Sequence, residues 1–162
     1  MIRLHLFYQA SPTVGYGHRK RCETLASEFN SRGCETALHN LCELDALTAE
    51  FAPADYVLAD IGSENILGIK AVAAKLSTPC IGLDYFGSDL LDLVICGFAH
   101  SPPAAEQFSK VSHDFFIIRP EIKSIRSVSK DGYVLVTTGG GDVKKLASEI
   151  LSRVSPLTER VL

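Results

Sequence analysis

The chain has 162 residues, of which 46% are hydrophobic and 22% charged, and its formal net charge is -3 at pH 7. This length and composition allow a buried core without disulfide or metal staples. The charge gives no case for binding nucleic acid, which usually needs a basic face. No apolar run approaches the roughly 20 residues that span a bilayer. The first residues have the pattern of a strand and lack the features of a signal peptide, so we expect a cytoplasmic protein.

The five cysteines are odd in number and form no C-x-x-C pair. Cys22, Cys80 and Cys96 lie among apolar neighbours, which is typical of small buried side chains. Neither the cysteines nor the histidines have the spacing of metal ligands. We therefore expect no metal site and no cofactor.

Short apolar strands alternate with helical segments along most of the chain. The strands are predicted at residues 2–8, 34–39, 55–59, 79–83, 93–96 and 114–118. The helices are predicted from His18 to the glycine at position 33, at 44–51 and at 66–76. This order indicates an α/β fold, a Rossmann-like parallel sheet with helices on both faces. Ligands of such sheets bind at the carboxyl edge of the strands.

The composition changes near residue 120. We expect a Rossmann-like domain at 1–122 and a polar linker at 123–131. Residues 132–162 contain a strand at 133–138, a glycine loop and a helix at 143–154, which is the first β-loop-α unit of a second domain. One such unit cannot build a sheet, so it either packs on the first domain or lacks its natural continuation.

The loop after the first strand, SPTVGYGHRKR at 11–21, is the most informative segment. Gly15 and Gly17 permit close backbone approach, and the helix that follows presents unpaired N–H groups to an anion. His18 lies at the mouth of this site, where a neutral imidazole can serve as a general base. The alternative is a histidine at a helix start that bonds to its own loop. A dinucleotide site is excluded because GYGHRK lacks the third glycine of G-x-G-x-x-G.

The second glycine segment is TTGGGD at 137–142, with Gly139, Gly140 and Gly141. These glycines either expose N–H groups to a phosphate or form a tight turn that Asp142 caps. The lysine of a P-loop is missing.

Four charged residues follow predicted strands at the ligand edge. Asp60 and Asp84 come directly after two buried strands, where an aspartate binds a ligand or caps a turn. Arg119 and Glu121 flank Pro120 and either pair with each other or set the hinge between the domains.

These segments occur in an order that resembles a known family. The residues that carry the resemblance are Gly15, Gly17, His18 and Arg21 in a G-x-G-H-x-x-R helix start, Asp84 in CIGLDYF, Arg119, Pro120 and Glu121 in FFIIRPEI, and the glycines of VLVTTGGGD. They resemble the UDP-sugar hydrolases of pseudaminic acid biosynthesis and their spore-coat polysaccharide relatives. That family has the GT-B architecture of two Rossmann-like domains. After Asp60 the family commonly has a His-Tyr pair, whereas this chain has Ile61 and Gly62.

The resemblance implies that His18 activates a water, which attacks the anomeric carbon of a UDP-sugar and releases UDP. We expect this substrate to be bound by Gly15, Tyr16, Gly17, Arg21, Asp60, Asp84, Arg119, Glu121, Gly139, Gly140 and Gly141. GT-B enzymes hold the nucleotide mainly with the second domain, so a partner chain or a missing C-terminal domain is expected to complete the site. Two other functions stay open: a GT-B glycosyltransferase with a UDP-sugar donor, and a non-catalytic domain that binds a sugar or a partner.

Overall fold

The computed structural model describes residues 1–84, 91–97, 109–111, 115–123 and 146–154 of the chain. Its strands are β1 (Arg3–Tyr8), β2 (Glu35–Asn40), β3 (Tyr56–Asp60), β4 (Cys80–Leu83), β5 (Leu93–Cys96) and β6 (Ser109–Val111). Its helices are α1 (Gly17–Ser31), the 3-10 turn η1 (Ser63–Asn65), α2 (Ile66–Leu76), α3 (Pro120–Lys123) and α4 (Ala147–Val154). None of the helices in these described ranges has the length and apolar character needed to cross a membrane.

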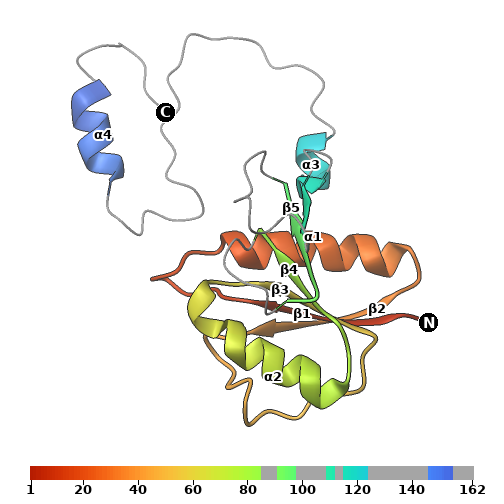
Figure 1. Ribbon diagram of the computed structural model, residues 1–162. Coiled ribbons are helices and arrows are strands. Elements are labelled where there is room, and N and C mark those ends of the chain that lie inside the picture. Colours follow the sequence, from red (N-terminus) through yellow and green to blue (C-terminus); the bar gives the residue numbers. More distant parts are fainter. Residues whose placement is uncertain (85–90, 98–108, 112–114, 124–145, 155–162) are drawn as a thin grey trace.

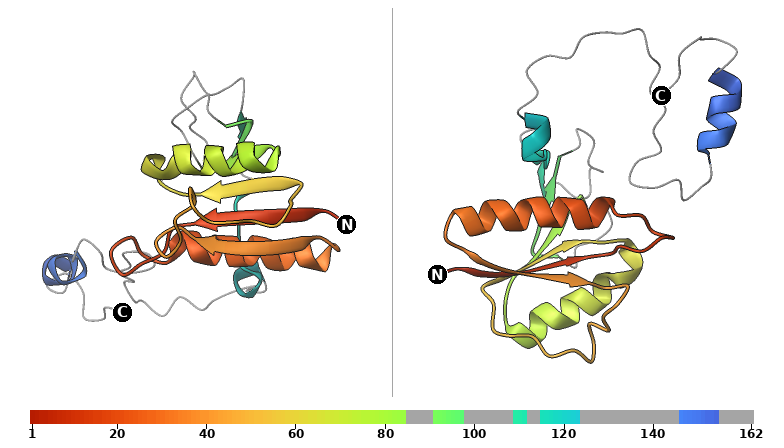
Figure 2. Two further views of the ribbon diagram at one scale, coloured as in Figure 1. Left: turned by 90° about the horizontal axis from the view of Figure 1, so that it is seen from below. Right: turned by 180° about the vertical axis from the view of Figure 1, so that it is seen from behind.

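The strands form one parallel sheet in the order β2-β1-β3-β4-β5-β6. In β1, Leu6 lies between Leu38 of β2 and Leu58 of β3. Helix α1 follows β1 and covers one face of the sheet, whereas α2 follows β3 and covers the other (Figures 1 and 2). The predicted Rossmann-like sheet with helices on both faces is confirmed. The carboxyl ends of β1 and β3 form its topological switch point, where ligands of open α/β sheets bind.

Successive side chains of β1 point to opposite faces of the sheet, as in any strand, and they pack into two separate cores. Leu4 and Leu6 pack on the α1 side with Cys22, Ala26 and Leu58. The core on the α2 side contains Phe7, Val57, Ala59, Ile66, Ile69, Val72 and Cys80. Burial raises the pKa of Cys22 to about 12 and that of Cys80 to about 11, so both thiols stay protonated and serve as small core side chains.

Helix α1 ends where its apolar stripe ends. The N–H of Arg32 donates to the carbonyl oxygen of Phe29 at 3.0 Å, and Gly33 follows with a φ of 82°. A left-handed φ favours glycine, so the predicted terminating role of Gly33 is confirmed.

The helix predicted at 44–51 is wrong, because this stretch forms turns. The Asp45 carboxylate accepts the N–H of Leu47 at 3.0 Å, and its carbonyl accepts that of Ala49 at 3.0 Å. Ala46 is buried and Phe51 packs against the core on the α2 side. A segment of this length does not hold a helix by itself, so its two apolar anchors determine its conformation.

The strand predicted at 114–118 is also wrong for residues 115–118, and the sixth strand, β6, lies earlier in the chain. The backbone of Phe116 passes close to Gly97. A Cβ added to Gly97 would lie only 3.3 Å from the Phe116 Cα. Residues 115–118 line a cavity together with Leu25 and Phe29 of α1. This apolar run therefore packs against the α1 side of the molecule instead of joining the sheet.

The predicted second unit is described only in part. Helix α4 lies within the helix predicted at 143–154, and α3 ends at the start of the predicted linker. The strand predicted at 133–138 lies outside the described residues.

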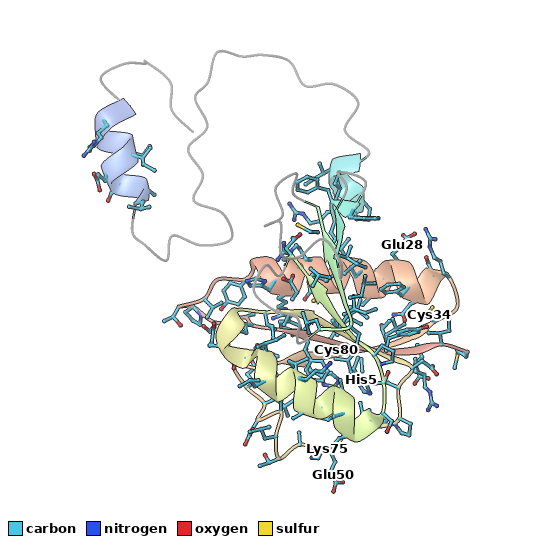
Figure 3. The ribbon with its side chains drawn as sticks, viewed as in Figure 1. His5, Glu28, Cys34, Glu50, Lys75 and Cys80 are labelled. Atoms are coloured by element: carbon cyan, nitrogen blue, oxygen red, sulfur yellow. The ribbon has the colours of Figure 1, made fainter. Side chains whose placement is uncertain are left out.

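His5 and His39 form a hydrogen-bonded pair on the α2 side of the sheet, where Figure 3 shows His5 below the strands. His5 Nδ1 lies 2.7 Å from His39 Nε2, and His5 Nε2 lies 2.9 Å from the carbonyl oxygen of Ala52. A carbonyl oxygen only accepts, so His5 carries its proton on Nε2 and receives a bond from His39 Nε2–H. The His39 ring stacks on Phe7 and meets Phe51 edge-on. Burial, and to a lesser degree the neighbouring His5, lower the pKa of His39 to about 4.

Because His39 is held neutral in this pair with His5, we predict that acid destabilises the fold. As the pH falls below about 6.5, the unfolded chain takes up a proton that folded His39 excludes until about pH 4. Because solvent reaches His39 and screens part of this effect, the free energy of unfolding should fall by about 1 kcal/mol between about pH 7 and about pH 5, as measured by urea unfolding. His39→Gln keeps a donor facing His5 but does not titrate, so it should lose less. An equal loss in both proteins would contradict this role of His39.

Candidate functional site

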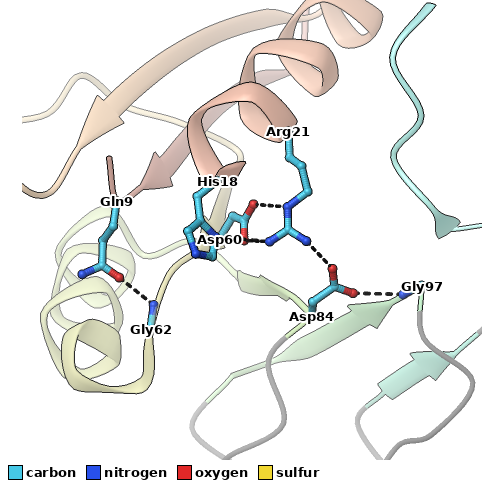
Figure 4. Close-up of polar contacts among 7 residues, drawn as sticks. All are labelled: Gln9, His18, Arg21, Asp60, Gly62, Asp84 and Gly97. Carbon is cyan, nitrogen blue, oxygen red and sulfur yellow. Dashed lines mark hydrogen bonds and ion pairs between the residues drawn. The ribbon is translucent and has the colours of Figure 1, made fainter. Parts of the chain in front are cut away.

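Four of the predicted site residues meet at the carboxyl edge of the sheet (Figure 4). His18 and Arg21 are three residues apart near the start of α1, so they share one face of the helix. Asp60 is the last residue of β3, and Asp84 follows the last residue of β4 with a φ of 51°. The fold thus brings a helix start and two strand ends into one polar network.

Asp60 is the centre of this network. Its side chain is only 1% exposed. Arg21 donates from Nε to Oδ2 at 2.8 Å and from Nη2 to Oδ1, so the guanidinium grips the carboxylate with two bonds. His18 Nδ1 lies 2.7 Å from Oδ1. A buried carboxylate is costly unless it is paired and hydrogen-bonded, and Asp60 meets both conditions.

Arg21 also reaches the next strand. Its Nη1 donates to Asp84 Oδ2 at 2.6 Å, and Asp84 Oδ1 accepts the N–H of Gly97 at 3.0 Å. One guanidinium therefore joins the ends of β3 and β4 and, through Asp84, the end of β5. Because one cation lies between two carboxylates, this group has one net negative charge while His18 is neutral.

The contacts of His18 determine its tautomer. Asp60 accepts two bonds from a guanidinium, so it is a carboxylate and can only accept. Arg21 Nη2 also lies 3.2 Å from Nδ1, but the contact with Asp60 is shorter, at 2.7 Å, and two acceptors could not approach so closely. We therefore place the proton of the imidazole on Nδ1. The lone pair of a neutral His18 is consequently on Nε2, for which the described residues give no hydrogen-bond partner. The side chain is 33% exposed, so this nitrogen can meet a water or a substrate.

The glycine loop is fixed from both ends. Gly15 has a φ of 91°, which favours glycine, and its N–H donates to the carbonyl oxygen of Ser11 at 2.8 Å. Asn40, at the end of β2, accepts the N–H of Ala10 and donates to its carbonyl oxygen, both at 3.0 Å. Sequence reasoning missed Asn40, although its place at a strand end of the ligand edge is a signal for such a role.

The start of α1 has open space around it and no side-chain cap. A Cβ on Gly17 would have no heavy atom within 4 Å, and Tyr16 is 41% exposed. The N-cap Tyr16 makes no capping bond with its side chain. The first N–H groups of α1 therefore lack a side-chain cap.

Two further residues beside His18 were not predicted. Gln9 follows β1, is 7% exposed, and accepts the N–H of Gly62 on its Oε1 at 2.6 Å (Figure 4). Its Nε2 donates to Glu64 Oε1 at 3.3 Å. The backbone N–H of Glu64 itself, then the Gln9 amide, lower the pKa of Glu64, to which His18 also contributes. In the sequence, a polar residue directly after the first strand, Gln9, was the signal that could have predicted this contact.

Arg119 and Glu121 do not join the network around Asp60. Arg119 lines a second cavity, of about 310 Å³, together with Lys20 and Arg21, of which Lys20 is paired with Glu23 and Arg21 with Asp60 and Asp84. Glu121 is exposed on α3. The predicted residues Gly139, Gly140 and Gly141 lie outside the described residues.

An apolar cavity of about 300 Å³ adjoins Asp84 on the α1 side. Its walls come from α1, β4, β5 and the segment at 115–118, with Phe29, Phe115 and Phe116 among them. This cavity suits an apolar group rather than a charged one. Across the part of the chain that the structure describes, no three His, Cys, Asp or Glu side chains are grouped so that they could hold a metal ion.

Comparison of this chain with models of protein families, with curated proteins and with solved structures gives no match. Its function is therefore inferred from the geometry of the site.

Removing the Arg21 guanidinium should destabilise the fold strongly. Arg21→Ala leaves the buried Asp60 carboxylate without its main partner, which we expect to cost about 3 kcal/mol in urea unfolding. The matched control is Arg32→Ala on the same helix, where the pair with Glu28 is 72% and 57% exposed. It should cost about 0–1 kcal/mol. Equal losses for the two variants would show that the network does not hold the sheet edge together.

Proposed function

We propose that this chain hydrolyses a nucleotide-linked sugar, with UDP as the leaving group and His18 as the general base. The observation that carries this proposal is the Asp60–His18 pair, which orients a partly exposed imidazole with its free lone pair on Nε2. A carboxylate behind a histidine is a recurrent arrangement of general bases, because it fixes the tautomer and stabilises the imidazolium. The sequence resemblance supplies the substrate class.

In the proposed step, His18 Nε2 takes a proton from water while the water oxygen attacks the anomeric carbon. The bond between that carbon and the phosphate oxygen breaks, its electron pair goes to the oxygen, and UDP leaves. The free sugar keeps the oxygen of water. The net negative charge of the Arg21, Asp60 and Asp84 group favours this step, because it balances the positive charge that develops on His18.

The diphosphate needs cations other than Arg21, whose guanidinium is already bound to two carboxylates. Arg119 lines the same cavity as Arg21 and offers positive charge beside the network, whereas the Lys20 ammonium is paired with Glu23 at 2.8 Å. The open start of α1 adds backbone N–H groups and the positive end of the helix dipole. We propose that these groups receive the anionic part of the substrate and that Gly139, Gly140 and Gly141 contribute further contacts to it.

Substitution of His18 tests the chemistry. The full chain is incubated with a panel of UDP-sugars in ¹⁸O-labelled water, and UDP release and label position are measured. We expect the label in the sugar and not in the phosphate, and a loss of roughly 100- to 10,000-fold in kcat for His18→Ala. Arg32→Ala, at the far end of α1, should keep its activity.

Four other outcomes would overturn this proposal. Label in the phosphate would place the cleavage at phosphorus. Sugar captured by an added acceptor instead of water would indicate a glycosyltransferase. Binding of UDP-sugars without any release of UDP would indicate a binding domain, and turnover that survives His18→Ala would show that the base lies elsewhere.

Substitution of Arg119 tests the anion contact. An exposed charge contact contributes about 1 kcal/mol, so Arg119→Ala should raise KM for the UDP-sugar about three- to tenfold and change kcat little. Because salt screens such contacts, the difference in KM between wild type and variant should shrink as ionic strength rises. Arg119→Lys should restore part of the affinity. An unchanged KM in Arg119→Ala at low salt would remove Arg119 from the substrate site.

A further inference from the structure

The carboxylate of Glu64 is bound beside the site by Gln9, which is itself fixed by a second contact. Gln9, whose side chain is almost fully buried at the end of β1, donates to Glu64 Oε1 at 3.3 Å. The other end of the Gln9 amide is fixed by the N–H of Gly62 at 2.6 Å. A buried amide that bridges a backbone N–H and an exposed carboxylate positions that carboxylate with little freedom.

Gly62 provides the space for this carboxylate. A Cβ built on Gly62 would lie 2.5 Å from Glu64 Oε2 and 2.6 Å from Oε1. Both oxygens thus occupy the volume that a side chain at position 62 would take. The carboxylate of Glu64 can take this place only because residue 62 is a glycine.

The carboxylate of Glu64 lies close to His18, on the side away from Arg21. Gly62 lies two residues after Asp60, and Figure 4 shows Gln9 and Gly62 on the side of His18 that faces away from Arg21. Glu64 is near enough to His18 for the two groups to interact electrostatically. Arg21 and its aspartates are therefore on one side of the imidazole, and Glu64 is on the other.

We propose that Glu64 binds a hydroxyl group of the sugar, which places the sugar ring on the Gly62 side of His18 and the diphosphate on the Arg119 side. This inference rests on the proposed function. An ionised carboxylate accepts strong hydrogen bonds from hydroxyl groups, which sugars offer in number. A negative charge at this point also disfavours the diphosphate, so it orients the substrate along the site.

The experiment measures binding as well as turnover of the full chain. UDP-glucose, UDP-N-acetylglucosamine and the monodeoxy analogues of each are titrated into wild type and Glu64→Gln by calorimetry. A hydrogen bond to a charged group predicts about a tenfold or larger loss of affinity in Glu64→Gln. That loss should disappear for the one deoxy analogue that lacks the bound hydroxyl. Where turnover is present, KM should rise equally and kcat should change little.

Two more variants separate this role from a structural one. Gly62→Ala keeps Glu64 in the chain but displaces its carboxylate, so it should reproduce the loss of Glu64→Gln. Glu50→Gln removes another exposed carboxylate, which lies near Lys75 at the opposite end of α2 from Glu64 (Figure 3), and should bind like wild type. Thermal unfolding of each variant should show folded proteins.

The outcomes for the two proposals differ. Binding that Glu64→Gln leaves unchanged overturns the role of Glu64 and leaves the hydrolase proposal intact. Binding that depends on Glu64 without UDP release overturns the hydrolase proposal and supports the subsite. A fall in kcat with a shifted pH profile and an unchanged KM would show that Glu64 acts on His18 instead of on the sugar. If none of the compounds binds to the wild-type chain, both proposals are overturned.

Discussion

The buried carboxylate of Asp60 is the constraint on which the site depends. It ends a central strand with only 1% of its side chain exposed, so its charge must be compensated by the protein itself. Arg21 and His18 provide that compensation from one face of α1. The same contacts therefore dock the helix against the sheet edge and orient the imidazole. Folding and the candidate chemistry depend on one group.

This arrangement limits what Arg21 can do. The motif suggested a cation for substrate binding, yet the guanidinium is divided between Asp60 and Asp84. Such a fork is a rigid structural element, and a lysine in its place would not join two strand ends. A phosphate would have to compete with two carboxylates for it. Positive charge for an anionic substrate must then come from more exposed residues, of which Arg119 is the best placed.

Periodicity in the sequence predicted the sheet, α1 and α2 because each buries an apolar face with a regular spacing. It failed at 44–51 and 115–118, where apolar residues pack as single anchors and neither a ladder nor a helix forms. Asp60 and Asp84 were predicted as ligand-edge residues from their place after strands. Their shared bond to Arg21 was not, because it depends on the spacing of β3 and β4 in space. Gln9 and Asn40 act through backbone groups of other segments, which a linear pattern does not reveal.

The strand order explains why the substrate-facing groups come from two sides. The chain leaves β1 towards α1 and leaves β3 towards η1 and α2 on the opposite face of the sheet. His18 arrives with the first of these connections and Glu64 with the second, and Gln9 links them from the end of β1. A ligand at this switch point meets a base from one helix start and a carboxylate from the other. The polarity across the site is thus a consequence of topology, and the substrate direction that we propose rests on it.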